Sequence, residues 1–145
     1  MRRFEFCRDD YLFCLAIAAC SLPGEADYAN GIDAYADQRF TDAAPYLQKS
    51  AQAGHVLGMA MLAGMLLKGQ GIARDATRAA EWYEKAASRG HADSQAILGL
   101  LYVNGIGVPH DATKARLWLG KAAEQGDKQS AWVLENLVER GVMRL

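Results

Sequence analysis

The repetitive part of this chain lacks cysteine, because Cys7, Cys14 and Cys20 all precede it. A disulfide framework is therefore excluded for the folded region. The chain also lacks a surplus of charge. Its formal net charge is −1 and no lysine or arginine cluster offsets it, which argues against electrostatic binding of nucleic acid. With three prolines and 51% hydrophobic residues in 145, the composition is that of one globular domain.

No apolar run is long enough to span a bilayer, which takes about 20 residues. The run from Tyr11 to Leu22 covers only 12 residues and makes residues 1–22 typical of a secretory signal. Its end, Ile17-Ala18-Ala19-Cys20, resembles a bacterial lipobox. This resemblance implies cleavage before Cys20, lipidation of that cysteine and a lipoprotein anchored in the outer membrane.

Two other interpretations of the first residues remain open. A secretory signal begins with net positive charge, but here Asp9 and Asp10 stand directly before the apolar run and offset the arginines that precede it. Cleavage after Ala26, where small residues stand at both key positions, predicts a soluble periplasmic protein. Without cleavage, the chain is cytoplasmic and its first helix caps the fold.

What the chain does contain is a repeat of 36 residues. Residues 76–90 recur as residues 112–126, and each copy follows a Gly-x-Gly loop and an aspartate. A period of this length indicates stacked supersecondary units, none of which can bury its apolar face alone. The sequence therefore predicts an all-α fold, an α-solenoid of antiparallel helix pairs.

Glycines at equal spacing divide the solenoid into units of an A helix and a B helix. The predicted units are a short one over 26–54, full repeats over 55–90 and 91–126, and a half-repeat capping helix over 127–145. Within them we expect helices over 26–37, 41–53, 92–103, 112–125 and 127–140.

Particular residues predict how these helices begin and end. Each B helix is followed by a glycine suited to a left-handed C-terminal cap, at Gly54, Gly90 and Gly126. Asp75 and Asp111 stand where an aspartate caps the next helix by accepting its free N–H groups. In the short unit, Pro45 is expected in the first helical turn, where proline is tolerated.

The second full unit carries a specific motif. It consists of Leu98-Gly99-Leu100-Leu101-Tyr102, Gly105, Gly107-Val108, Asp111, Lys114-Ala115, Trp118, Lys121-Ala122-Ala123 and Gly126. This pattern resembles the Sel1-like repeat, a 36-residue relative of the tetratricopeptide repeat, and the first unit is closer to a plain tetratricopeptide. The resemblance implies a right-handed solenoid that acts as an adaptor, often in bacterial envelopes. Some members have one disulfide per repeat and a link to penicillin binding, but this chain lacks those cysteines.

The positions of the motif divide into core and candidate surface. Small and aromatic packing positions are expected in the core, namely Ser94, Leu98, Gly99, Tyr102, Trp82 and Trp118. The other side of the A helices presents an apolar stripe with a polar edge, which suits a partner helix or an extended peptide on a concave face. The predicted partner-binding residues are Met61, Met65, Lys68, Ile97, Leu101, Asn104, Val133, Leu137 and Arg140. The alternative is that these side chains are solenoid core.

Catalytic chemistry has little support. The only candidates for a general base or metal ligand are His55, His91 and His110, and no His-Glu-x-x-His motif, nucleophile elbow or Cys–His pair accompanies them. His55 and His91 share one repeat position, so stacking separates them by about 10 Å, too far for one metal. We expect no enzyme, no metal and no cofactor.

The sequence therefore predicts a protein–protein interaction module, an adaptor or scaffold in the bacterial envelope or periplasm. Its partner is another protein, with no nucleic acid, and membrane contact comes only through a lipid on Cys20. Two alternatives are an immunity or regulatory protein for a secreted effector, and a cell-wall or β-lactam-related protein.

Overall fold

The computed structural model describes residues 22–140, and within them the regular secondary structure is entirely helical. The seven helices are α2 (Glu25–Ala36), α3 (Phe40–Gln52), α4 (Val56–Lys68), α5 (Ala76–Ser88), α6 (Ala92–Asn104), α7 (Ala112–Glu124) and α8 (Lys128–Glu139). The expected A helices are α2, α4, α6 and α8, and the B helices are α3, α5 and α7. Predicted and observed boundaries agree within one residue. The predicted lipidation site Cys20 lies outside the described residues.

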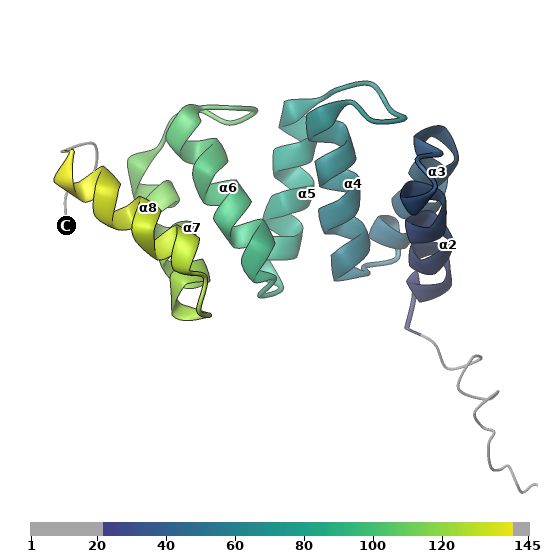
Figure 1. The fold of residues 1–145 in the computed structure, drawn as a ribbon, viewed down its shortest axis with the longest axis horizontal. Coiled ribbons are helices and arrows are strands. Elements are labelled where there is room, and N and C mark those ends of the chain that lie inside the picture. Colours follow the sequence, from purple (N-terminus) through teal and green to yellow (C-terminus); the bar gives the residue numbers. More distant parts are fainter. Residues whose placement is uncertain (1–21, 141–145) are drawn as a thin grey trace, which may run out of the picture.

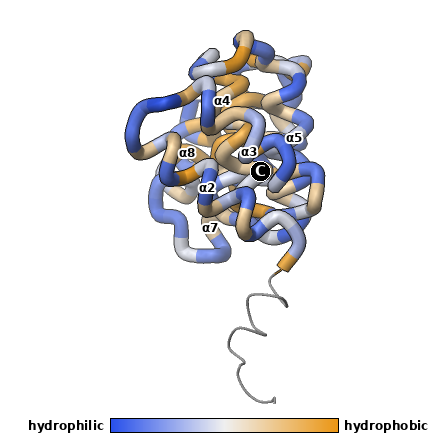
Figure 2. Tube along the Cα trace, turned by 90° about the vertical axis from the view of Figure 1, so that its right-hand side faces the viewer, coloured by the Kyte–Doolittle hydropathy of each residue, from blue (hydrophilic) through white to orange (hydrophobic). Residues whose placement is uncertain are grey.

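The helices stand side by side in an elongated row that follows the sequence (Figure 1). Each helix packs mainly against the next one along the chain, as expected for a solenoid. Viewed along the row, hydrophobic segments gather toward the interior and hydrophilic segments lie outside (Figure 2). The all-α solenoid predicted from the repeat is confirmed.

The core consists of three buried clusters in sequence along the row. Alanines occupy many of the contact positions, for example Ala43, Ala79 and Ala115, each completely buried. Because alanine adds little beyond the backbone, neighbouring helices can approach closely and the large side chains between them fill the remaining space. The core is therefore built from contacts between units as much as within them.

Residues expected in the core mostly lie there. Ser94, Leu98, Gly99 and Tyr102 are buried, which confirms their assignment. Trp82 and Trp118 are only partly buried at the rim of the clusters. The Nζ atom of Lys85 lies 4.0 Å from the ring centroid of Trp82, and that of Lys121 lies 4.6 Å from the ring centroid of Trp118. Such contacts keep an aromatic ring near the surface, where the cation stays hydrated.

The predicted helix ends are confirmed in detail. The side chain of Asp75 accepts a hydrogen bond from the N–H of Arg78, and that of Asp111 accepts from Thr113 and Lys114. Gly54, Gly90 and Gly126 all have positive φ, 92° for Gly90. In the two full repeats, local sequence signals therefore set where the B helices begin and end.

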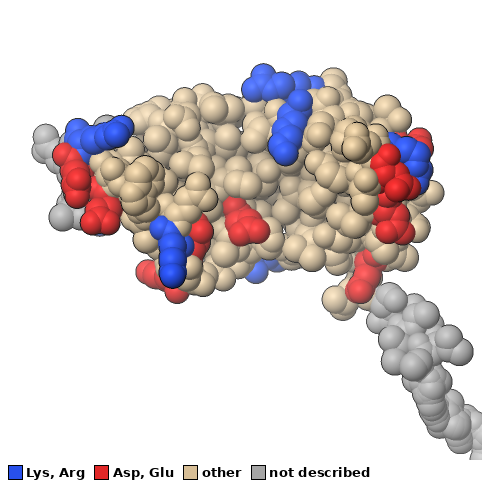
Figure 3. Space-filling view, viewed as in Figure 1, with Lys and Arg blue, Asp and Glu red and all other residues tan. Residues whose placement is uncertain are grey.

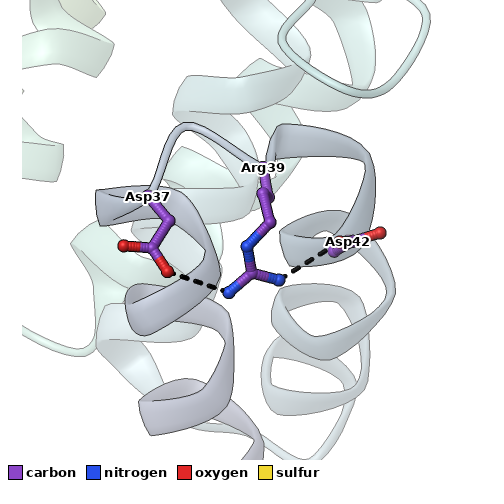
Figure 4. A network of polar contacts seen from close by, with 3 residues as sticks. All are labelled: Asp37, Arg39 and Asp42. Carbon is purple, nitrogen blue, oxygen red and sulfur yellow. Dashed lines mark hydrogen bonds and ion pairs between the residues drawn. The ribbon is translucent and has the colours of Figure 1, made fainter.

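The short first unit joins its helices without a Gly-x-Gly loop. Gln38 takes the left-handed conformation, with φ 61°, and Arg39 bridges Asp37 and Asp42 at 3.0 and 3.2 Å (Figure 4). These exposed ion pairs add little stability, but they orient the turn. Pro45 is the sixth residue of α3, not part of its first turn, because α3 begins at Phe40. The proline therefore offers no N–H to the carbonyl of Thr41.

Candidate functional site: a groove along the A helices

A hollow of about 480 Å³ opens between α2, α4 and α6, with one residue of α5 at its base. We call it the A-helix groove. Its lining is largely apolar and aromatic and includes Tyr28, Met61, Leu67, Tyr83 and Ile97. Concave, mostly apolar surfaces with a few polar groups are the usual binding sites of proteins.

The lining of the A-helix groove also includes polar residues, two of them charged. Lys68, at the end of α4, and Asp93, in the first turn of α6, are both exposed. The hydroxyl of Tyr35 donates a hydrogen bond to the side-chain oxygen of Gln70 at 3.0 Å, which ties α2 to the loop after α4. Over the middle of the face in Figure 3, charged side chains are sparse compared with the two ends of the row.

Tyr83 forms part of the base of the groove and is almost completely buried. Burial raises the pKa of its phenol to about 12, and the nearby Tyr35 adds to this shift, because both disfavour a phenolate. The hydroxyl therefore stays protonated and can only take part in neutral hydrogen bonds at ordinary pH.

A second hollow of about 280 Å³ lies between α6 and α8. Ile97, Leu100 and Val133 line it together with Asp93, and the two hollows meet at Ile97, which lines both. Of the predicted partner-binding residues, Met61, Lys68, Ile97 and Val133 thus lie along one continuous face of the A helices.

Other predicted residues lie elsewhere. Met65 and Leu101 are 1% and 4% exposed, so they belong to the core and a partner cannot reach them. Met65 joins the buried cluster of the first unit with Ala43 and Leu47, because that neighbouring helix pair covers its side of α4. Leu137 is partly buried against the core cluster of the last units.

The remaining two predicted residues are exposed at helix ends. The side-chain amide of Asn104 donates to the carbonyl of Leu100 at 3.0 Å and thereby stays on its own helix. Arg140 is the C-terminal cap residue of α8. Neither lines a hollow of the A-helix face.

Sequence reasoning missed Trp132 on α8, whose side chain is 61% exposed. One and two repeat periods earlier stand Ala96 and Ala60, which line the two hollows of the A-helix face. A tryptophan at that position places a large exposed aromatic ring on the α8 segment of the A-helix face. The repeat alignment contained this signal.

The shared position of His55 and His91 has a structural explanation. Each is the N-cap residue of an A helix, and its Nδ1 accepts a hydrogen bond from the N–H of Gly58 or Ser94. Asp127 caps α8 in the same way. Residues 22–140 contain no group of three or more histidine, cysteine, aspartate or glutamate side chains placed to hold a metal ion. Nor does any helix in this range combine the length and apolar character that a membrane span requires.

Comparisons with known proteins agree with this architecture. A family model described as Sel1 repeat matches residues 26–55, 56–91 and 92–127, so it includes the short first unit. No curated protein matches the chain.

Solved structures that are similar to the chain include the following three. A protective antigen of uropathogenic Escherichia coli strains has a TM-score of 0.78 and 30% identity, over 88% of this chain and 28% of that one. A Sel1 repeat protein from Oxalobacter formigenes has a TM-score of 0.74 and 32% identity, over 87% of this chain and 38% of that one. Cysteine-rich protein B of Helicobacter pylori has a TM-score of 0.60 and 26% identity, over 63% of this chain and 69% of that one. The chain thus spans about a third of the length of the first two.

Sel1 repeat proteins are protein–protein interaction modules and generally non-catalytic scaffolds. Matches over three consecutive units, together with the same solenoid in solved relatives, extend well beyond half of the chain. The chain therefore belongs to the Sel1 repeat family.

Proposed function

We propose that this chain is a non-enzymatic adaptor of the bacterial envelope that holds a partner helix or extended peptide on its A-helix face. The observation that carries the proposal is the A-helix groove, where Tyr28, Met61 and Ile97 come together from three helices. Aromatic and methionine side chains are enriched at protein interfaces because they supply large contact areas and adapt to their partner.

The shape and chemistry of the face favour an elongated ligand with apolar side chains. The two hollows meet at Ile97 and continue to Val133 on α8. Trp132 adds an exposed aromatic ring on the same helix. Lys68 and Asp93 place one charge of each sign at the edge, which suits orientation of the ligand more than its affinity.

A pair of matched variants tests the site. Met61→Glu with Ile97→Glu puts two carboxylates into the groove, whereas Thr41→Glu with Thr77→Glu puts two carboxylates on exposed, repeat-equivalent positions of the B helices. Both are compared with wild type as tagged bait in envelope extract, followed by mass spectrometry of the bound proteins.

We expect a partner that binds wild type and the B-helix variant but not the groove variant, with helicity and melting temperature unchanged in all three. Retention of the partner by the folded groove variant would show that the site lies elsewhere. If the groove variant unfolds, Lys68→Glu provides a second test, because Lys68 is exposed and its charge reversal leaves the core intact.

The envelope location is a separate part of the proposal and rests on the lipobox-like Ile17-Ala18-Ala19-Cys20. We expect metabolic labelling with palmitate that disappears in Cys20→Ala. An unlabelled protein cleaved after Ala26 would instead support a soluble periplasmic form, and an unlabelled full-length protein would place the adaptor in the cytoplasm.

A further inference from the structure

The C-terminal end of the row carries a second groove, separate from the A-helix face. A hollow of about 910 Å³ lies between α7 and α8, the two helices at the left end of the row in Figure 1. We call it the end groove. Its apolar lining comprises Leu117 and Gly120 from α7, and Leu134 and Val138 from α8.

The repeat register shows what such a face accommodates. One period earlier, Leu134 and Val138 correspond to Leu98 and Tyr102 of α6, which are buried. Those two side chains lie in one core cluster with Leu119 of α7, the B helix that follows α6. The end groove is therefore the equivalent of a surface that receives a helix elsewhere in this chain. Among residues 22–140 no helix covers it, and Leu117 is 53% exposed.

One residue distinguishes this surface from its inner equivalents. In the first and third units, a glycine of the A helix faces a leucine of the next B helix at close range, and the second unit has the small residue Ala63 in the core beside Tyr83. A Cβ added to Gly99 would lie 2.6 Å from Cγ of Leu119, and one added to Gly31 would lie 2.7 Å from Cγ of Leu47. In α8 the corresponding residue is Glu135, which is exposed. A helix that packed on α8 as α7 packs on α6 would place a leucine against the side chain of Glu135, which is too large and too polar for this contact.

The charges around the end groove indicate what can bind there. Its lining includes three carboxylates, on Glu124, Glu135 and Glu139, and two cations, on Arg116 and Lys121. Carboxylates outnumber cations in this lining, so a partner surface that carries basic residues complements it better than a second copy of the same surface does. A helix with a basic residue facing Glu135 would instead pair with it.

Gly120 supports the approach of a helix backbone. It lies within α7, where alanine would stabilise the helix by about 1 kcal/mol. A Cβ at Gly120 would meet no atom within 4 Å, so the packing of the described residues does not require glycine there. The absence of a side chain leaves the backbone of α7 open to close contact from the end groove.

We propose that the end groove binds an amphipathic α-helix of a partner protein. The apolar stripe of this helix packs on Leu117, Leu134 and Val138, and a lysine or arginine pairs with Glu135. The site is independent of the A-helix groove and lets one chain hold two proteins, one along its face and one at its end.

The test uses a peptide whose geometry is already represented in the chain. The probe is the sequence of residues 112–124 with Leu119→Lys, kept helical by a lactam bridge on its exposed side, since a peptide this short is marginally helical alone. The matched control is the same bridged peptide with leucine retained. Binding of both labelled peptides to the full chain is measured by fluorescence anisotropy.

We expect the lysine peptide to bind wild type about tenfold more tightly than the leucine peptide, the effect of one charge-assisted pair. Glu135→Gly restores the glycine that α6 has at this position and is expected to reverse this preference. Glu135→Gln keeps the size of the side chain and is expected to abolish the preference, with the fold checked by circular dichroism. Leu134→Asp is expected to weaken both peptides, whereas Ile97→Glu in the A-helix groove leaves them unchanged.

Equal binding of the two peptides, or a preference that Glu135→Gln leaves intact, would overturn the proposal. So would binding that depends on Ile97 rather than Leu134. The alternative occupant of the end groove is a second copy of the chain, and sedimentation of the chain alone tests it. A monomer is expected, whereas a dimer that Leu134→Asp dissociates would show that a second copy fills the end groove.

Discussion

Gly107 offers the sharpest test of how consecutive units hold together. It is the second glycine of the Gly-x-Gly loop between α6 and α7, and its φ is 74°. A Cβ added there would overlap the carbonyl oxygen of Ala76 and lie 2.5 Å from its carbon. Ala76 is the first residue of α5, in the preceding unit, so this loop touches the unit before it through bare backbone.

Gly105, two residues earlier, is a natural control. Its φ is 67°, so an alanine there meets the same left-handed conformation. The nearest atom to an added Cβ is, however, the backbone nitrogen of His110 at 3.5 Å, an ordinary contact. Gly105→Ala therefore measures the conformational cost alone, and Gly107→Ala measures the same cost plus the collision with Ala76.

The expected magnitudes follow from these two contributions. Placing alanine in the left-handed region costs about 1–2 kcal/mol. Overpacking against a fixed backbone costs about 1–3 kcal/mol more. We therefore expect Gly107→Ala to lower the free energy of unfolding by about 2–5 kcal/mol, and Gly105→Ala by about 1–2 kcal/mol.

Equilibrium unfolding in urea, followed by far-UV circular dichroism, measures both differences. The slope of the free energy with urea also reports on cooperativity, because nearest-neighbour contacts couple the units of a solenoid. A Gly107→Ala variant with a reduced slope would have uncoupled its unit from α5. If the two variants lose equal stability, the close approach between the loop and Ala76 does not hold the units together, and our reasoning is refuted.

Three further predictions concern single side chains. The pKa of Tyr83 is about 12 in the folded chain and 10.0 in the unfolded chain. The free energy of unfolding therefore falls as pH rises between these values. The loss is about 2–3 kcal/mol at most, and alkaline urea titrations of Tyr83→Phe are expected to lack it. His91→Ala removes the N-cap of α6 and lowers stability by about 1 kcal/mol in thermal unfolding, whereas His91→Asp, which copies Asp127, retains it; equal losses in both would contradict the cap. Gly120→Ala raises stability by up to about 1 kcal/mol, and a loss of stability would mean that the position is crowded.

The histidine caps show a limit of reading residues by type. His55 and His91 were candidates for a general base or a metal ligand because imidazole serves both roles. Their shared repeat position showed only that the two side chains are too far apart to bind one metal. Their task is local, since each Nδ1 accepts a backbone N–H three residues later. The aspartate at the same position of the last unit was the available signal, because aspartate is a preferred N-cap residue.

The repeat period, glycines and capping residues by themselves determined the helices, their boundaries and the family. These signals act over a few residues along the chain, so they are legible without the third dimension. Only the tertiary structure decided which side chains a partner can reach. Met61 lines the A-helix groove while Met65, one turn away, is buried, because the helix pair before α4 covers one side of that helix and leaves the next open. The same rule makes Glu135 informative: its position matters because the packing of inner helices requires a small residue there, and packing is a property of neighbours that are distant in sequence.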